Sequence, residues 1–588
     1  QLLGVDKIGL TDNFFELGGH SLLAMQMISR LQKAFSVEIP LRQLFDTPTV
    51  AGMCEAVAVS LSGGCSYLPP AIDKADRSRP LPLSYAQERL WFIDRLMAGS
   101  ATYNMPSVFR LSGSATAPVL EQGLGEVVRR HEALRTRYRS TEVGPVQVID
   151  EPEAMLLPVV DLSRLNEQEA QREARLLARQ EASRPFDLSR GPVLRARLLK
   201  IGGQARVMLL NVHHIASDGW SQKVMKRELG RLYEVYARGE PSVLEELEIQ
   251  YSDYAVWQRE WLRRGVLEEQ MKYWRRQLAG ISGVLELPAD GKRGAEQGSV
   301  GASQAVVMSE ELGRRLREAS LAEAVTPYMM VLSGFEVVLM RYSNQRDIVV
   351  GTAVSGRSRE EVEGLVGLFV NTVAVRVKVR AEASVRGMVK EVKEAVLEGQ
   401  AHQDVPFEKV VEEMAPERSL SLNPLVQVMV VMERAEESYA APGVAAVEGS
   451  GPRIREGDGK FDLTLRVVDA GERMVLSIAY NADLYNGSRI HRMLEHLQLL
   501  LQSMLADLDQ PISALPLLTP AEQHQLLREW SNSGKDYPHR GCVHKLFVEQ
   551  VEKTPDKVAT LFNSSLLTFR ALDEQSNRLA SLLRRLNP

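Results

Sequence analysis

Two adjacent histidines, followed by an Asp-Gly pair, are the residues of this chain best suited to do chemistry. They are His213, His214, Asp218 and Gly219 in the stretch NVHHIASDGWSQ. A neutral imidazole can accept a proton near physiological pH, so one histidine can serve as a general base. The aspartate can hold the turn through an ion pair with a cation. A bare histidine pair is more often packed core, so a structural interpretation stands beside the catalytic one.

The elements on either side of the pair predict where it lies. The short apolar run VMLLNV before it predicts a buried strand, and apolar residues at helical spacing after Trp220 predict an amphipathic helix. The histidines therefore fall at a strand-to-loop exit, where functional groups are common. Adjacent side chains of an extended segment point to opposite faces. One histidine can thus face a channel while the other packs inward.

A second candidate site is Ser21, which follows Gly18 and Gly19 and precedes an apolar-periodic helix in GGHSLLAMQMI. The N-terminus of a helix favours an anion, because backbone N–H groups point out of it. No His-Asp partner lies nearby in the sequence, so a nucleophilic serine is weakly supported. A serine that carries a phosphate ester fits better, and a simple N-cap is the alternative.

Composition excludes several classes of protein. The 588 residues predict about three to five domains. A net charge of -5 gives no electrostatic reason to expect nucleic acid or an anionic membrane as a partner. Three scattered cysteines have no metal-ligand spacing and indicate a reducing compartment, so we expect a cytoplasmic protein without metal or disulfides. No apolar run or basic-then-apolar leader predicts a membrane span or signal peptide.

Two stretches rich in proline or in small polar residues divide the chain, around 60–82 and around 507–520. The first segment has helical periodicity and predicts a small helical bundle. The large middle segment mixes apolar strands with amphipathic helices. Both ends of the sequence look cut from a longer polypeptide, with the first helix of the bundle largely missing.

The motif DNFFELGGHSLLA resembles the attachment site of peptidyl carrier proteins of nonribosomal peptide synthetases. The resemblance implies that Ser21 carries 4'-phosphopantetheine, added by a phosphopantetheinyl transferase, whose thiol holds a donor peptide as a thioester. The form GGHS resembles carriers that feed a condensation domain.

The pattern HHxxxDG resembles the third motif of condensation domains, which belong to the chloramphenicol acetyltransferase-like superfamily. All seven family motifs appear in order along the chain, among them SYAQERLWFIDRL, RRHEALRTRY, YSDYAVWQRE and VGLFVNTVAVR. The resemblance implies a multidomain chain in which a small all-α carrier precedes a two-lobed α/β unit with a tunnel between its lobes. We expect the following boundaries: carrier 1–60, linker 61–79, N-terminal lobe 80–255, C-terminal lobe 256–510 and linker 511–534.

The implied reaction is attack of a carrier-bound aminoacyl amine on the donor thioester. It assigns His214 to the reaction, to orient the amine and accept its proton, while His213 packs inward. Asp218 would hold the loop through an ion pair, for which Arg357 in VSGRSREE is the candidate partner. The Gly219 N–H would contact the oxyanion.

Residues 535–588 resemble the start of an adenylation domain, through LTFRALDEQSNRLA. The implied partners are that domain and a downstream acceptor carrier, in a pathway typical of antibiotic or siderophore biosynthesis. Rival interpretations are an epimerisation-type domain, which DGWS disfavours, and a non-catalytic recruitment domain. A heterocyclisation domain would carry aspartate in place of the histidine pair, and a free small-molecule acyltransferase would not need the attached carrier.

Overall fold

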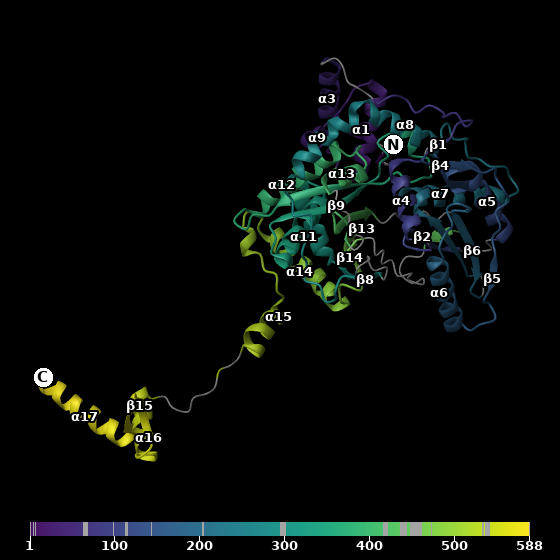
Figure 1. Cartoon of the computed structure of the whole chain (residues 1–588). Helices are drawn as coiled ribbons and strands as arrows, with labels where there is room; N and C mark the ends of the chain where they lie inside the picture. The colour runs from purple at the N-terminus through teal and green to yellow at the C-terminus, as the bar shows by residue number, and fades with distance from the viewer. Residues whose placement is uncertain are drawn as a thin grey trace. The chain divides into compact units, whose positions relative to one another are not determined.

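The chain forms two compact units, Gln1–Thr519 and Pro520–Pro588. The structure, a computed structural model, describes residues 2–3, 5, 7–62, 69–97, 99–111, 116–142, 144–202, 205–294, 301–415, 422–434, 444–446, 461–471, 473–531, 534 and 541–586. Figure 1 shows the elements in chain order, from purple to yellow.

Three short helices form the start of the first unit: α1 (Ser21–Phe35), α2 (Leu41–Asp46) and α3 (Val50–Ser62). The helix predicted after Ser21 is confirmed. Ala24 and Ile28 of α1 lie one turn apart and pack with Leu44 of α2 and Met53 of α3 in a small apolar core. The helical spacing of the sequence is therefore that of a buried face.

A five-stranded sheet carries the histidine pair. Its order is β12-β2-β7-β6-β5, with bounds Val444–Ala446, Asn104–Leu111, Arg206–His213, Leu194–Lys200 and Val159–Asp161. Helices α5 (Ala117–Arg130) and α7 (Gly219–Tyr236) share an apolar core with one set of strand residues, and α6 (Glu167–Ser183) shares a separate core with another set. Strand β7 is thus covered on both faces, which explains its unbroken apolar run.

A small three-stranded sheet and three helical segments complete this half of the unit. The sheet has the order β1-β4-β3, with bounds Leu81–Pro82, Gly144–Ile149 and Thr136–Thr141. The helical segments are α4 (Tyr85–Leu96), a 3-10 turn (Glu132–Arg135) and α8 (Tyr251–Trp261). A π-helical turn, Leu262–Val266, joins α8 to α9 (Leu267–Gln277), which packs in an apolar core with residues of the second half.

A six-stranded sheet forms the second half, in the order β10-β9-β11-β13-β14-β8. Only β11 pairs in parallel, with β9 and β13. The strand bounds are Asn371–Lys378, Asp347–Val354, Val428–Arg434, Leu463–Ala470, Arg473–Asn481 and Gly301–Val307. The helices are α10 (Glu310–Ala322), α11 (Pro327–Ser343), α12 (Val385–Ala401), α13 (Phe407–Met414) and α14 (Gly487–Ala506).

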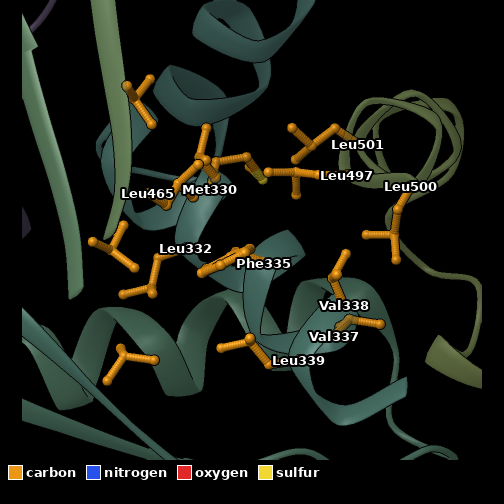
Figure 2. Packing of buried hydrophobic residues seen from close by; sticks show 14 of the residues in the cluster. Met330, Leu332, Phe335, Val337, Val338, Leu339, Leu465, Leu497, Leu500 and Leu501 are labelled. Carbon is orange, nitrogen blue, oxygen red and sulfur yellow. The ribbon is translucent and has the colours of Figure 1, made fainter. Parts of the chain in front are cut away.

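Helix α11 lies in the middle of the core of this half. Figure 2 shows its apolar side chains, Phe335 among them, against Leu497 and Leu501 of α14 and Leu465 of β13. Gly334 lets α14 approach, because a Cβ at this position would lie 2.8 Å from Leu501 Cδ2. A single helix therefore sets the packing of the second sheet.

Helix α11 also buries a carboxylic acid. Glu336 is fully buried, and neither of its carboxylate oxygens has a hydrogen-bond partner among the described residues. Burial raises its pKa well above the usual 4.5. The folded protein therefore holds this proton more tightly than the unfolded chain.

We expect Glu336→Gln to remove a pH-dependent loss of stability. With the folded pKa raised, this group's contribution is most favourable below pH 4.5 and declines as pH rises toward the folded pKa, by about 1.4 kcal/mol per unit. Melts of both proteins between pH 4.5 and 8 should show the glutamine variant gaining relative stability as pH rises. A constant difference across that range would contradict the buried, neutral carboxyl.

One segment crosses between the halves. Strand β12 lies late in the chain but pairs antiparallel with β2 of the first sheet, with Val444 opposite Leu111. The boundary that we expected at 255/256 does not account for this strand, because its pairing is long-range.

The segment before β1 is tied to the rest of the unit. The Pro70 carbonyl accepts hydrogen bonds from Trp257 Nε1 at 2.9 Å and Arg359 Nη1 at 2.6 Å. Asp253 accepts from the Ala75 N–H at 2.8 Å. Residues 70–75 of the expected linker are therefore fixed to the unit.

The first residues of the second expected linker, 511–534, pack in the first unit. Ile512 and Leu515 are buried in the core around α11, on a 3-10 turn at Ile512–Ala514, so these residues belong to the first unit. The second unit contains α15 (Pro520–His524), a π-helical turn (Gln525–Trp530), α16 (Val543–Lys553), β15 (Val558–Phe562), β16 (Ser565–Thr568) and α17 (Phe569–Leu586).

In the part of the chain that the structure describes, no single helix has the length and apolarity to span a membrane. One pair, Glu310–Ala322 with Pro327–Ser343, meets those criteria only together and across a 106° bend.

Candidate active site

The histidine pair lies where β7 ends and α7 begins. His213 is the last residue of the strand, a 3-10 turn covers His214–Ala216, and α7 starts at Gly219. Asp218 caps the helix, because its Oδ1 accepts the Ser221 N–H at 2.7 Å. The strand exit and the cap together hold the turn.

His213 packs inward. It is 2% exposed and lies between the rings of Tyr103 and Phe186, with centroids 6.4 and 5.9 Å away. Its Nδ1 accepts the Ile215 N–H at 3.1 Å. In the neutral ring the proton is therefore on Nε2, and the side chain closes the turn.

His214 has the opposite tautomer. Its Nδ1 lies 2.8 Å from the Ser217 carbonyl oxygen, which can only accept, so Nδ1 carries the proton. In the neutral form of this half-buried ring, Nε2 is then the nitrogen that can accept a proton. This is the tautomer that a general base needs.

Asp218 is 1% exposed and gathers donors from two distant parts of the chain. Its Oδ1 lies 2.7 Å from Ser221 Oγ and accepts from Arg357 Nη2 at 3.3 Å. Its Oδ2 accepts the N–H groups of Phe369 and Val370 at 3.0 and 3.2 Å. The carboxylate is therefore satisfied by the protein itself.

The structure places Arg357 against Asp218 in a buried ion pair. Arg357 also donates to the carbonyls of Val362 and Leu365 and stacks over the Phe369 ring at 4.0 Å. Burial lowers its pKa from the usual value, and the Asp218 charge opposes that shift. A guanidinium remains charged in such a site, so the pair fixes the turn from both sides.

The β9–β10 loop, residues 355–370, crosses from the second half to the first. Its Glu363 carbonyl oxygen accepts a hydrogen bond from Trp220 Nε1 at 2.8 Å. Its Leu368 carbonyl oxygen accepts one from the Tyr251 hydroxyl at 2.6 Å. The Val366 N–H donates to Nδ1 of the buried His131 at 3.3 Å. Loop and active-site turn thus form one hydrogen-bonded body.

Gly219 is the first residue of α7. A Cβ built there would meet no described atom within 4 Å. The space beside its backbone is open, whereas the neighbouring Asp218 is enclosed. The structure thus leaves room beside the Gly219 Cα.

Ser21 is the first residue of α1. His20 before it makes no side-chain cap, so the first backbone N–H groups of the helix suit a phosphate ester. Gly19 is required there, because a Cβ would lie 2.5 Å from the Phe14 carbonyl oxygen. Burial, then the charges of Arg434 and Lys223, lower the pKa of His20. Two cations, one of them on α7, thus act on the residue that precedes Ser21.

The sequence did not predict Ser221, Phe369 and Val370 as part of this site. Ser221 could have been found as the third residue of a helix capped by Asp218. The two loop N–H groups lie more than 150 residues from Asp218, so no local pattern indicates them. Among the described residues, no group of three His, Cys, Asp or Glu side chains could hold a metal.

Two family models match this chain. Residues 78–527 match the condensation domain model, and residues 1–57 match the phosphopantetheine attachment site model. A linear gramicidin synthase protein of Brevibacillus parabrevis is 41% identical over 588 residues, which are 100% of this chain but 12% of that protein. Malpibaldin synthetase of Mortierella alpina is 37% identical over 587 residues, 100% of this chain and 10% of that protein. The chain thus spans about a tenth of the curated relatives it matches.

Two solved structures share the fold. The X-domain in complex with OxyB from teicoplanin biosynthesis is 26% identical, with a TM-score of 0.69 over 77% of this chain and 100% of that one. The first condensation domain of the calcium-dependent antibiotic synthetase, in complex with a substrate analogue, is 21% identical, with a TM-score of 0.64 over 75% and 100%. This chain belongs to the condensation domain family of nonribosomal peptide synthetases and carries a phosphopantetheine attachment site ahead of that domain.

Proposed function

We propose that this chain forms a peptide bond between a donor peptide carried on Ser21 and an amine carried by a downstream carrier. The observation that carries the proposal is the tautomer of His214, whose Nδ1–H is held by the Ser217 carbonyl so that Nε2 can accept a proton. The matches to the condensation and attachment-site models support it.

The reaction needs neither a strong general acid nor a strong general base. An α-amino group has a pKa of about 8 and a thiol of about 8.5, so the amine is partly deprotonated and the thiolate leaves readily. The amine nitrogen attacks the thioester carbonyl, the C–S bond breaks, and His214 Nε2 passes the amine proton to the leaving sulfur. Proximity and the Gly219 N–H facing the oxyanion supply much of the remaining stabilisation.

The residues around Ser21 suit its cofactor. A 4'-phosphopantetheine arm would supply the thiol that holds the donor peptide. The uncapped start of α1 would face its phosphate, and Gly19 lets the chain pass close to Phe14 just before that helix. A phosphopantetheinyl transferase is the partner that this site requires.

The finer domain assignment is part of the proposal. Residues 1–60 would be the helical bundle of a carrier, and 80–255 and 256–510 the two lobes of a chloramphenicol acetyltransferase-like fold. Residues 535–588 would open an adenylation domain, ahead of the acceptor carrier. The two large sheets, one in each half of the first unit, support the division into lobes.

A recruitment domain is the second candidate. The observation that favours it is the X-domain, which shares the fold and was solved in complex with OxyB. The stereochemistry of the donor α-carbon after incubation distinguishes an epimerisation-type domain from both other functions, because only epimerisation inverts that carbon. Peptide formation between loaded carriers would exclude recruitment as the sole role.

Replacing His214 should lower activity, whereas replacing His213 should lower stability. His214→Ala should keep the fold but lower single-turnover condensation by about a hundredfold, the lower end of the range for a general acid–base group. His213→Ala should lower the free energy of unfolding by about 1–3 kcal/mol, because it leaves the Ile215 N–H unpaired. Thermal melts and product formation are measured on both variants. Normal condensation by His214→Ala with a collapsed melt would reverse the two roles.

A further inference from the structure

Basic side chains of the carrier segment, residues 1–57, meet carboxylates of the condensation domain. Lys33 Nζ of α1 lies 2.7 Å from Glu360 Oε2, and Arg30 Nη2 lies 3.8 Å from Glu363 Oε2. Glu360 and Glu363 lie in the β9–β10 loop. Glu360 raises the pKa of Lys33 through their hydrogen bond, so the lysine is charged in this contact.

A second contact extends the same pattern to helix α12. Arg42 of α2 lies 2.8 Å from Glu394 and 3.8 Å from Glu398. The carrier side is basic at every one of these pairs, and the condensation side is acidic. We name the four carboxylates Glu360, Glu363, Glu394 and Glu398 the acidic seat.

An apolar anchor lies beside the acidic seat. Phe45 of α2 is 1% exposed and belongs to the apolar core that contains Val389 and Val392 of α12. Its ring is tilted against that of Phe15, with centroids 4.9 Å apart, and Lys393 Nζ lies 5.9 Å from the Phe45 ring. The contact thus combines charged pairs with a buried aromatic residue, as in a specific interface.

The acidic seat connects to the active-site turn. The carboxylate of Glu363 faces Arg30, while its carbonyl oxygen accepts the hydrogen bond of Trp220, the residue after Gly219. Arg359, next to Glu360, holds the Pro70 carbonyl of the linker. A carrier on the acidic seat is therefore held at the loop that supports Asp218.

We propose that the acidic seat selects the donor carrier by charge, so that its four carboxylates are specificity-determining residues for the basic face Arg30, Lys33 and Arg42. The inference rests on the proposed function, because it names which carrier delivers the donor. Exposed ion pairs add little affinity one by one. Complementary patches instead decide which partner docks and how fast, and like charges reject the wrong one.

A charge-reversal series on the whole chain tests this proposal. The donor is loaded on Ser21 from a peptidyl-coenzyme A, and aminoacyl-pantetheine in solution is the acceptor. Arg30→Glu with Lys33→Glu should slow single-turnover product formation about tenfold. Adding Glu360→Lys and Glu363→Lys should restore most of the rate. Lys7→Glu, a single reversal of the same kind at an exposed carrier residue, should have no effect.

A second donor separates this proposal from the proposed function. The same peptide is supplied as a pantetheine thioester in solution, and the ratio of carrier-borne to free-donor rate is followed. The ratio should fall in the variant with Arg30→Glu and Lys33→Glu, called the double reversal. It should recover when Glu360→Lys and Glu363→Lys are added, which gives the fourfold exchange. Absence of product from either donor in the unmodified chain would overturn the proposed function, and an unchanged ratio in the double reversal would overturn charge selection.

Hydrogen exchange tests docking without catalysis. Amides of α1 and of residues 359–363 should exchange faster in the double reversal and return to the original rate in the fourfold exchange. Equal exchange in all variants would overturn the acidic seat whatever the activity. A carrier-borne rate constant that rises with protein concentration would show delivery by a second copy and overturn selection of the chain's own carrier.

Discussion

Ser21→Ala should abolish uptake of the phosphopantetheine arm. Arm transfer forms a phosphodiester on the serine hydroxyl, and alanine offers no oxygen for that bond. The backbone at the start of α1 should not change, because His20 rather than Ser21 is the N-cap residue. Intact-mass measurement after incubation with coenzyme A and a phosphopantetheinyl transferase should show one arm on the unmodified chain and none on the variant.

Ser62→Ala is the matched control. Ser62 is exposed at the end of α3, and its hydroxyl donates only to the Val59 carbonyl among the contacts found. This variant should take up one arm at the normal rate. Equal uptake by Ser21→Ala would place the attachment site elsewhere and would remove the donor from the proposed reaction.

Asp218→Ala should lower the free energy of unfolding by about 3–5 kcal/mol. The change leaves the buried Arg357 guanidinium without its carboxylate, and loss of one partner of a buried pair costs about that much. It also removes the acceptor for two loop N–H groups and the cap of α7. Urea unfolding gives the free energy, and condensation should fall with it because the turn loosens.

Two further variants isolate the ion pair. Ser309 is an exposed N-cap of α10, so Ser309→Ala measures the loss of a cap alone, about 1 kcal/mol. The double variant with Arg357→Ala and Asp218→Ala should lose less free energy of unfolding than the two single variants added together. The double variant removes both charges, so no buried charge is left unpaired. Full stability of Asp218→Ala with lost activity would instead make Asp218 a direct participant in the chemistry.

The local parts of the site could be predicted from the sequence. Strand β7, the histidine pair and the capped helix are contiguous, so periodicity and turn chemistry were enough to place His213 and Asp218. The helix after Ser21 followed from the same reasoning. Each of these elements is a continuous stretch of chain, so its own periodicity or its cap residue indicates it.

The long-range parts could not be predicted. Nothing near Asp218 indicates Phe369 or Val370, and nothing in the loop around Glu360 indicates a carrier lysine 327 positions away. Strand β12 joins a sheet whose other members precede it by more than 200 residues. Such pairings depend on the tertiary fold, in which shape and charge bring together segments that share no local signal.

The fixed carbonyl of Pro70 limits how far the carrier can travel. The eight residue steps from Ser62, the end of α3, to Pro70 can extend at most about 29 Å, whatever path they take. The end of α3 therefore stays within that radius of a point held by Trp257 and Arg359. Its effective concentration is on the order of millimolar. A hybrid synthetase that exchanges carriers should join its parts before Pro70, because a junction after it would release this anchor and dilute the donor.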